Sequence, residues 1–426
     1  MFFKNLFMVA ALFLSVFLPL GVSAQSELVA AINSKLIPLK TIIHGDDFSD
    51  LQPLKKILKD KKVIGLGESA HGVHDFFVFK QRLLEFLVKE MGVKVLLTEI
   101  DFAGAGIIND YVLHGKTDAY KALAGAGGGV WNTQEFVDML QWVKKYNDTQ
   151  PDKDKVRIYG FDNTRGNTAA FLLQIYLGST NQTTDVLKQG LEAMGKGARA
   201  NNEERAAMKT MVEQLKTVQF NQPGDEAKYY QHLVRIAEQY VDYAAPAATA
   251  DPNEKNNQRD KNMAENIEWL YHYTNDSKTV IWSHSEHLAK TINSSGVARA
   301  GIYLNEAFKN DYYLLGLCFN SGKIKSQPSA GNPAGIYDIP EVTMANNSDA
   351  LFAQCKAPNF MLDFKTASTN PVIKDYLNTI VSSYFIGSNY AAKAGTDQMY
   401  VQHKWNEGYD GIVFIKNVSA ATAIKQ

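Results

Sequence analysis

The chain of 426 residues carries 44 Lys and Arg against 45 Asp and Glu, which gives a net charge of −1 at pH 7. This balance excludes the classes of protein that bind nucleic acid or anionic membranes through a strongly basic surface. Hydrophobic residues make up 45% of the chain and aromatic residues 11%, enough for a large core in one α/β domain with an insertion, or in two domains.

Residues 1–24 have the pattern of a secretory signal peptide. A short basic start is followed by an apolar stretch over 6–18 and by Val22-Ser23-Ala24, a small-residue cleavage site before Gln25. The apolar stretch is too short to span a membrane. We therefore expect an exported protein, periplasmic or secreted, without a membrane span, whose mature part runs over 25–426.

Short hydrophobic runs rich in β-branched residues alternate with segments of helical periodicity. This alternation predicts an α/β fold with a mainly parallel central sheet, buried on both faces and flanked by helices. A helix over 75–91 that ends at Gly92 joins the first two runs into a βαβ unit. We expect strands at 63–67, 93–98, 156–161, 279–283, 312–317, 360–363 and 411–415.

A glycine-rich loop at 125–129 precedes a helix that Thr133 is expected to cap and that reaches Tyr146. The loop does not follow a strand and carries no Lys-Ser or Lys-Thr, so a flexible active-site loop is favoured over a phosphate loop.

The segment between the third and fourth strands is almost wholly helical. Residues 166–245 resemble a small helical bundle, 245–257 a polar and mobile linker, and 258–271 a helix that returns to the sheet. We predict that this helical insertion, about 166–257, forms a lid over the ligand cleft.

Four of the predicted strands end on residues that can carry a proton or bind a metal. In parallel sheets the ligand crevice lies beyond the carboxyl ends of the strands, so these side chains are expected to meet there. Such a gathering of acids and imidazoles predicts an enzyme site. The residues are Glu68 and His71, Glu99, Asp162, and His284 and His287.

Glu68-Ser69-Ala70-His71-Gly72 is the sharpest short motif. A neutral His71 can accept a proton from water, and Glu68 can orient its ring. No Gly-x-Ser-x-Gly elbow occurs, so water is the natural nucleophile. The alternative is a polar turn in which His71 is only structural.

His284 and His287 lie three residues apart, directly after a buried strand. In a helical turn they can face one point, where they would bind a metal, or polarise a carbonyl and protonate a leaving alcohol. The alternative is that one of them, His287, merely caps the strand end.

Three further residues have less specific signals. Asp162 is expected to order loops by hydrogen bonding. Arg259 offers a guanidinium to a carboxylate or an oxyanion, or else forms a solvated ion pair with Asp260. Lys80, one turn inside the helix after His71, is placed to point back at the site.

The two cysteines, Cys318 and Cys355, have two readings. They can pair in an oxidising compartment, but Cys318 follows an apolar run, which fits a buried free thiol equally well.

These motifs resemble those of the erythromycin esterase family, in the same order over nearly the whole mature chain. The matching stretches are Gly67-Glu68-Ser69-Ala70-His71-Gly72, Glu99 at a strand end, Trp131-x-Thr133-x-Glu135, Gly160-Phe161-Asp162, Arg259-Asp260-x-Asn262-Met263-Ala264-Glu265-Asn266, Trp282-x-His284-x-x-His287, 312–316 and 409–414.

The resemblance implies an α/β fold with a helical insertion over a deep cleft. It also implies hydrolysis of a macrolide lactone or related ester by histidine-activated water, without a metal or other cofactor, and with it macrolide resistance. His71 would be the base and Glu99 its partner in placing the water. Glu68, itself among the catalytic residues, would polarise the substrate with His284 and His287.

Lys80 and Arg259 are assigned to substrate binding as well. Macrolide-hydrolysing members carry Arg nine residues after the base, where this chain has Lys80. An ammonium cannot make the planar, bidentate contact of a guanidinium. The resemblance therefore predicts the reaction class more firmly than the compound.

Two other functions use the same residues. In a zinc-dependent hydrolase, His71, Glu99, His284 and His287, or some of them, would hold the metal that activates water. A non-catalytic exported protein would hold an apolar or porphyrin-like ligand in the same cleft. Loss of activity with a chelator would distinguish the zinc-dependent hydrolase from the metal-free one. Ligand binding without turnover would identify the non-catalytic protein.

Overall fold

The computed structural model describes residues 20–244, 252–292, 296–328, 332–390 and 399–424. Within these residues a nine-stranded sheet has the order β1-β8-β11-β6-β2-β5-β3-β4, and β7 pairs with β6 beside this path. Its strands are β1 Ile37–Pro38, β2 Val63–Glu68, β3 Val95–Asp101, β4 Arg157–Asp162, β5 Thr279–His284, β6 Tyr312–Ser326, β7 Gly335–Ile339, β8 Asn359–Asp363 and β11 Gly411–Val418.

The strands from β11 to β4 run parallel to one another, whereas β1, β7 and β8 pair antiparallel. Alternate residues of one strand enter two separate cores, as Val63 and Ile64 of β2 do. The mainly parallel sheet flanked by helices, predicted from the sequence, is confirmed. A second sheet pairs β9 Val381–Tyr384 with β10 Tyr400–His403.

The helices agree closely with the periodicity of the sequence. The helix predicted at 75–91 is observed over His74–Met91 and ends where Gly92 adopts φ 72°. Thr133 caps the next predicted helix by accepting the amide hydrogen of Phe136. The longer helices are α1 Leu20–Asn33, α3 His74–Met91, α4 Ala105–His114, α5 Ala119–Gly125, α6 Gln134–Asn147, α7 Asn167–Ser179, α8 Asp185–Lys196, α9 Asn202–Leu215, α10 Asp225–Ala244, α11 Pro252–Tyr273, α13 Ala300–Phe308 and α16 Pro371–Leu377.

Short helices fill several connections. They are α2 Pro53–Ile57, α12 Ser285–Leu288, α14 Ser348–Phe352, α15 Phe364–Ala367 and α17 Trp405–Gly408, with 3-10 turns at Gly129–Trp131, Asp152–Asp154, Gly197–Arg199 and Lys309–Asp311.

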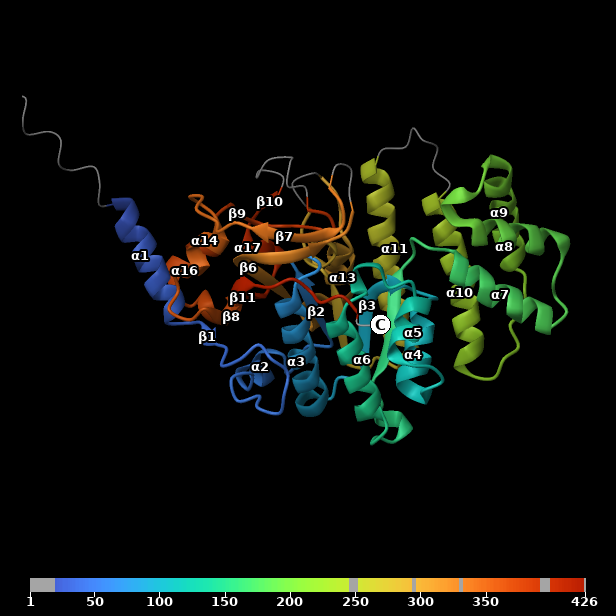
Figure 1. The fold of residues 1–426 in the computed structure, drawn as a ribbon, viewed down its shortest axis with the longest axis horizontal. Coiled ribbons are helices and arrows are strands. Elements are labelled where there is room, and N and C mark those ends of the chain that lie inside the picture. Colours follow the sequence, from blue (N-terminus) through green and yellow to red (C-terminus); the bar gives the residue numbers. More distant parts are fainter. Residues whose placement is uncertain (1–19, 245–251, 293–295, 329–331, 391–398, 425–426) are drawn as a thin grey trace, which may run out of the picture.

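The helical insertion forms a bundle of α7 to α10 at one end of the molecule, beyond the edge strand β4, while α1 lies at the opposite end (Figure 1). One boundary differs from the prediction. The linker expected over 245–257 lies outside the described residues up to 251, but from Pro252 onward the chain is already helical, since proline is well suited to a first helical turn.

Three expectations concern the termini and the cysteines. Residues 1–19 of the predicted signal peptide lie outside the described residues, and α1 runs through the expected cleavage site. Across the described ranges, no helix has the length and apolarity needed to cross a membrane. Cys318 and Cys355 are free and buried, so the disulfide reading was wrong.

The pairing of β3 with β4 contains an irregularity close to the strand ends. Thr98 pairs with Gly160 and Asp101 with Asp162, so β3 carries one more residue than β4 over this interval. A side chain on Gly160 would collide with the carbonyl oxygens of Ile100 and Asp101, at 2.4 and 2.6 Å from its Cβ. Glycine at 160 therefore allows the bulge.

Candidate active site

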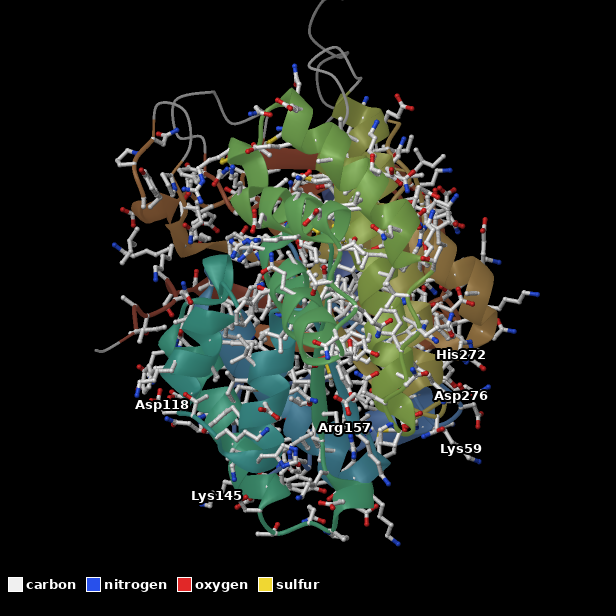
Figure 2. The ribbon with its side chains drawn as sticks, turned by 90° about the vertical axis from the view of Figure 1, so that its right-hand side faces the viewer. Lys59, Asp118, Lys145, Arg157, His272 and Asp276 are labelled. Carbon is white, nitrogen blue, oxygen red and sulfur yellow. The ribbon has the colours of Figure 1, made fainter. Side chains whose placement is uncertain are left out.

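A cleft of about 400 Å³ lies at the carboxyl ends of β2, β5, β3 and β4. Figure 2 gives its direction: Arg157, which begins β4, and Asp276, which precedes β5, lie low in the view, so these strands run upward toward the side of the bundle. The cleft is lined by His71, Glu99, Ile100, Asp101, Gly127, Gly128, Gly129, Val130, Trp131, Asp162, Thr164, Arg165, Arg259, His284, Glu286, His287, Gly387 and Ser388.

The predicted lid does not line this cleft. Thr164 and Arg165, just before the bundle, and Arg259, in α11 after it, contribute side chains, but the lining includes no described residue of 166–244. The bundle instead stacks beyond the edge strand β4. The glycine-rich loop does contribute Gly127 to Gly129, as expected of an active-site loop.

The turn after β2 places His71 in the cleft and fixes its orientation. Gly72 adopts φ 70°, and a Cβ there would lie 1.9 Å from the carbonyl oxygen of Lys325, so only glycine fits. Nδ1 of His71 is 2.7 Å from Oε1 of Glu68. A carboxylate accepts, so Nδ1 carries the hydrogen in the neutral ring and Nε2 keeps a free lone pair.

Glu68 lies beneath His71 and is 1% exposed. Its second oxygen, Oε2, accepts from Nζ of Lys80 at 2.6 Å and from the indole of Trp282 at 3.2 Å. Burial alone would raise the pKa of Glu68, but the Lys80 ammonium and the hydrogen bond to His71 lower it to about 2. Glu68 is therefore the ionised partner that orients His71.

Lys80 does not lie where a substrate could touch it, contrary to the sequence prediction. Its side chain is 0% exposed, is not among the cleft residues, and packs 4.9 Å from the ring centre of Trp282. Burial lowers the pKa of Lys80 to about 8 against the opposing effect of Glu68. Lys80 thus influences the cleft through the Glu68 carboxylate.

Glu99, two residues before the end of β3, is held by two pairs of donors. Oε2 accepts from the Ser283 hydroxyl at 2.7 Å and from the His284 amide at 3.1 Å. Oε1 is 3.3 Å from both Nη2 of Arg259 and Nε2 of His287. Burial opposes ionisation, but His287 and Arg259 bring the pKa of Glu99 well below its usual value. The carboxylate bonded to His71 is Glu68 rather than Glu99.

His287 lies between two carboxylates. Its Nδ1 is 2.7 Å from Oδ1 of Asp260, and its Nε2 faces Glu99. Burial would lower the pKa of His287, but Asp260 and Glu99 raise it to about 10. The ring is therefore an imidazolium at neutral pH, and Nη1 of Arg259, 3.4 Å from Nε2, is a second donor on the same side.

Asp260 supports this imidazolium from below the cleft. It is 0% exposed and also accepts from Nη1 of Arg299 and the amide of Ala300, both at 3.1 Å. The second guanidinium nitrogen of Arg299, Nη2, binds Glu286. The solvated ion pair considered for Arg259 and Asp260 is not formed, because each binds a different partner.

Both nitrogens of His284 are occupied. Nδ1 accepts the amide hydrogen of Glu286 at 3.2 Å and caps α12, and Nε2 is 3.3 Å from the carbonyl oxygen of Ile386. Burial and the nearby His71 lower the pKa of His284 to about 4, so the ring is neutral. His284 is therefore the residue that caps the strand end, a structural role that the sequence reading had considered as an alternative for His287.

Arg259 and Asp162 form a bidentate pair on the cleft wall. Nε of Arg259 is 3.0 Å from Oδ1 of Asp162 and Nη2 is 3.1 Å from Oδ2. Asp162 also accepts from the amide of Asn163 and the hydroxyl of Thr164. It holds the loop after β4 in place, as expected, and keeps Arg259 in the cleft.

Asp101, Trp131 and Arg165 are among the cleft residues to which sequence reasoning gave no role. Asp101 is on the same strand as Glu99, two positions on, and period-two alternation was the available signal. Trp131 donates its indole N–H to the carbonyl oxygen of Glu99 at 3.1 Å. Arg165 donates to the carbonyl oxygen of Gly127 at 2.7 Å and so joins two loops. No pattern in the sequence around Arg165 predicts this contact.

The donor set also bears on the zinc reading. Over the described part of the chain, no three His, Cys, Asp or Glu side chains are arranged so that they could hold one metal ion. His284 has both nitrogens bonded and His287 is protonated between two acids, which leaves His71 Nε2 as the free imidazole donor among these three.

A mainly parallel sheet with histidines and carboxylates converging at its carboxyl edge is the architecture of an α/β enzyme. The chain belongs to the erythromycin esterase family: the family model described as Erythromycin esterase matches residues 88–418. The match begins after Glu68, His71 and Lys80, which the geometry nevertheless joins to the matched part.

Two curated relatives agree with this assignment. The chain is 25% identical to the erythromycin esterase type II of Escherichia coli over 68% of its own length and 77% of that protein. It is also 25% identical to YbfO of Bacillus subtilis strain 168, which is named as a hydrolase, over 88% of each chain. Family and relatives support a hydrolase that acts on a small molecule.

Solved structures share the fold. A Bacillus cereus protein superposes with a TM-score of 0.82 at 25% identity and covers 94% of this chain and 99% of that one. A mutant erythromycin esterase in its open conformation superposes with a TM-score of 0.62 at 14% identity and covers 92% of this chain and all of the other.

Proposed function

We propose that this protein hydrolyses a carboxylic ester, in the first place a cyclic ester such as a macrolide lactone, with water as the nucleophile and His71 as the general base. The observation that supports this most directly is the ring orientation of His71. Nδ1 is tied to an ionised Glu68, which leaves Nε2 as the proton acceptor of a ring that lines the cleft.

In the proposed reaction, Nε2 of His71 takes a proton from water while the water oxygen attacks the ester carbonyl carbon. Collapse of the tetrahedral adduct breaks the bond to the alkoxy oxygen, and His71 returns the proton to that oxygen. A lactone thereby becomes a hydroxy acid. The ionised Glu68 stabilises the imidazolium form of His71 during the cycle.

Two positive groups that line the cleft are suited to the charge that develops on the carbonyl oxygen. Arg259 and the His287 imidazolium are both fixed by carboxylates before any substrate enters. Positive charges that are preoriented in this way stabilise an oxyanion without reorganisation. Glu99 holds both of them and so has a positioning role in this scheme.

Mass spectrometry of macrolides and simple lactones incubated with wild type and with His71→Ala tests the proposal. We expect a product heavier by one water with wild type and a rate lower by about 10²- to 10⁴-fold with the variant. His74→Ala is the matched control, since His74 is 40% exposed, binds Glu135 and does not line the cleft. If a chelator abolished the activity and zinc restored it, the metal-free mechanism would be wrong and the zinc-dependent one would take its place.

We also propose that the protein is exported and, if it opens macrolides, contributes to macrolide resistance. The first part rests on the composition of residues 1–24. Amino-terminal sequencing of the protein recovered from the periplasm or the medium should begin near Gln25. Full-length protein in the cytoplasm would contradict the proposal.

A further inference from the structure

A second cavity of about 380 Å³ adjoins the cleft, and the function proposed above does not use it. This side pocket is lined by Glu286, Ile292, Arg299, Ile380, Phe385 and Val401, among others. Glu286 lines both cavities, and its ion pair with Arg299 stands between them. The two spaces therefore share one wall.

A second contact joins the cavities. The ring of Phe385 lies edge-on against His284, with 4.8 Å between ring centres, so that opposite sides of this pair face different cavities. Phe385 follows β9, and Val401 belongs to β10. Figure 1 shows β9 and β10 on the α14 side of the molecule, far from the α7–α10 bundle. The side pocket thus lies on the β9 and β10 side of the molecule and not beside the bundle.

Two large apolar side chains are unusually exposed in the side pocket. Ile292 is 61% exposed and Ile380 is 60% exposed, although the pocket wall around them also holds Phe385 and Val401. Each exposed aliphatic side chain is a source of binding energy when an apolar ligand covers it. The rest of the wall includes polar and charged residues such as His403, Lys404 and Glu407, so the apolar surface of the side pocket is the patch that Ile292, Ile380, Phe385 and Val401 form.

We propose that the side pocket binds the apolar hydrocarbon part of the ester substrate, whose ester group lies in the cleft across Glu286. This inference rests on the proposed function and names the substrate class: esters with a sizeable apolar part rather than short, polar ones. The charged pair Glu286–Arg299 marks the boundary at which the polar end of the substrate must give way to its apolar end.

Chain-length dependence with 4-nitrophenyl acetate, butyrate and octanoate tests this substrate class. For the wild type, kcat/KM should rise with chain length by up to about fourfold for each methylene that becomes buried. Ile380→Ser should lower kcat/KM about tenfold for octanoate and less than twofold for acetate, mainly through KM. A wild type that shows no rise with chain length would overturn the proposal.

Ile336→Ser is the matched control, because Ile336 is 63% exposed on β7 and lines neither cavity. It should leave the chain-length dependence unchanged. Equal behaviour of the two serine variants would overturn the proposal, because the loss would not then be specific to the side pocket.

Binding of 1-anilinonaphthalene-8-sulfonate separates this proposal from the catalytic one. Its fluorescence titration needs no turnover, and we expect weaker binding to Ile380→Ser than to wild type or Ile336→Ser. If the wild type hydrolyses no ester but this difference appears, the catalytic proposal fails and the apolar site stands. If all three proteins bind the dye equally, the apolar site fails whatever the esterase assay gives.

Discussion

Two of the three histidines that line the cleft, His71 and His287, have opposite surroundings. His71 has one carboxylate, Glu68, and one free nitrogen; His287 has a carboxylate at each nitrogen. The first ring can therefore exchange a proton, while the second is locked in its charged form. The carboxylates bonded to each ring therefore decide which of the two histidines can act as a base.

The largest expected effect comes from removing the Glu68 carboxylate that is bonded to His71. In Glu68→Gln the side-chain amide no longer fixes the tautomer with a free Nε2, and Lys80 loses its counterion in a fully buried position. We expect kcat to fall by about 10⁴-fold, the size that a wrong tautomer produces in a catalytic triad. Steady-state kinetics on an accepted ester measures it.

Glu135→Gln is the control for that change. Glu135 also binds a histidine, His74 at 2.6 Å, but this pair lies outside the cleft. The kcat of Glu135→Gln should stay within a factor of about two of the wild-type value, because this substitution touches no catalytic group. Equal losses of kcat in Glu68→Gln and Glu135→Gln would show that both substitutions act through folding rather than catalysis.

Removing the positive charge of His287 should lower the stability of the protein more than the change at His71 does. His287→Gln leaves Asp260 and Glu99, both buried, without the cation that joins them. The free energy of unfolding should fall by about 3–5 kcal/mol, as when one member of a buried ion pair is removed. Urea denaturation measures it, with His71→Gln as the matched variant, for which we expect a smaller loss. The reverse order would contradict the assignment of charge.

The pH dependence of stability sharpens the same contrast. Since the pKa of His287 is raised to about 10 from an ordinary 6.5, its stabilising contribution is complete below pH 6.5 and is lost as the pH rises through 10. The melting temperature of wild type should fall over this window more steeply than that of His287→Gln. Parallel curves would mean that His287 is not charged.

The smallest expected effect concerns the loops at the cleft mouth. Arg165→Gln removes the hydrogen bond to Gly127 from an exposed position, so KM should rise by a few-fold with kcat and stability nearly unchanged. Arg157→Gln, at the far end of β4 (Figure 2), should change neither constant. A large fall in kcat for Arg165→Gln would place Arg165 among the catalytic groups.

Much of this architecture follows from local patterns in the sequence. Buried β-branched runs predicted the parallel strands, and Gly92 and Thr133 marked helix ends correctly, because these signals depend on neighbouring residues alone. The meeting of Glu68, His71, Glu99 and His287 followed from the rule that parallel strands end at one edge.

Pairings across the fold were not predictable in this way. The sequence reading assigned Lys80 to the substrate and took the helical insertion for a lid. Both depend on which residues are brought together by chain packing: Lys80 is enclosed against Trp282, and the bundle stacks beyond β4. The role of Arg299, held between Asp260 and Glu286, likewise has no local signature.

The bulge at the end of β3 has a consequence for how this site can change over evolutionary time. With one residue more than its neighbour β4, the strand end brings both Glu99 and Asp101 into the cleft lining, while Ile100 between them belongs to a buried hydrophobic core. Substitutions at Glu99 and Asp101 can alter the charge and shape of the cleft without moving a strand. Their closeness in the sequence makes this short stretch sensitive to single-residue deletion, which would reset the register and remove acids from the site together.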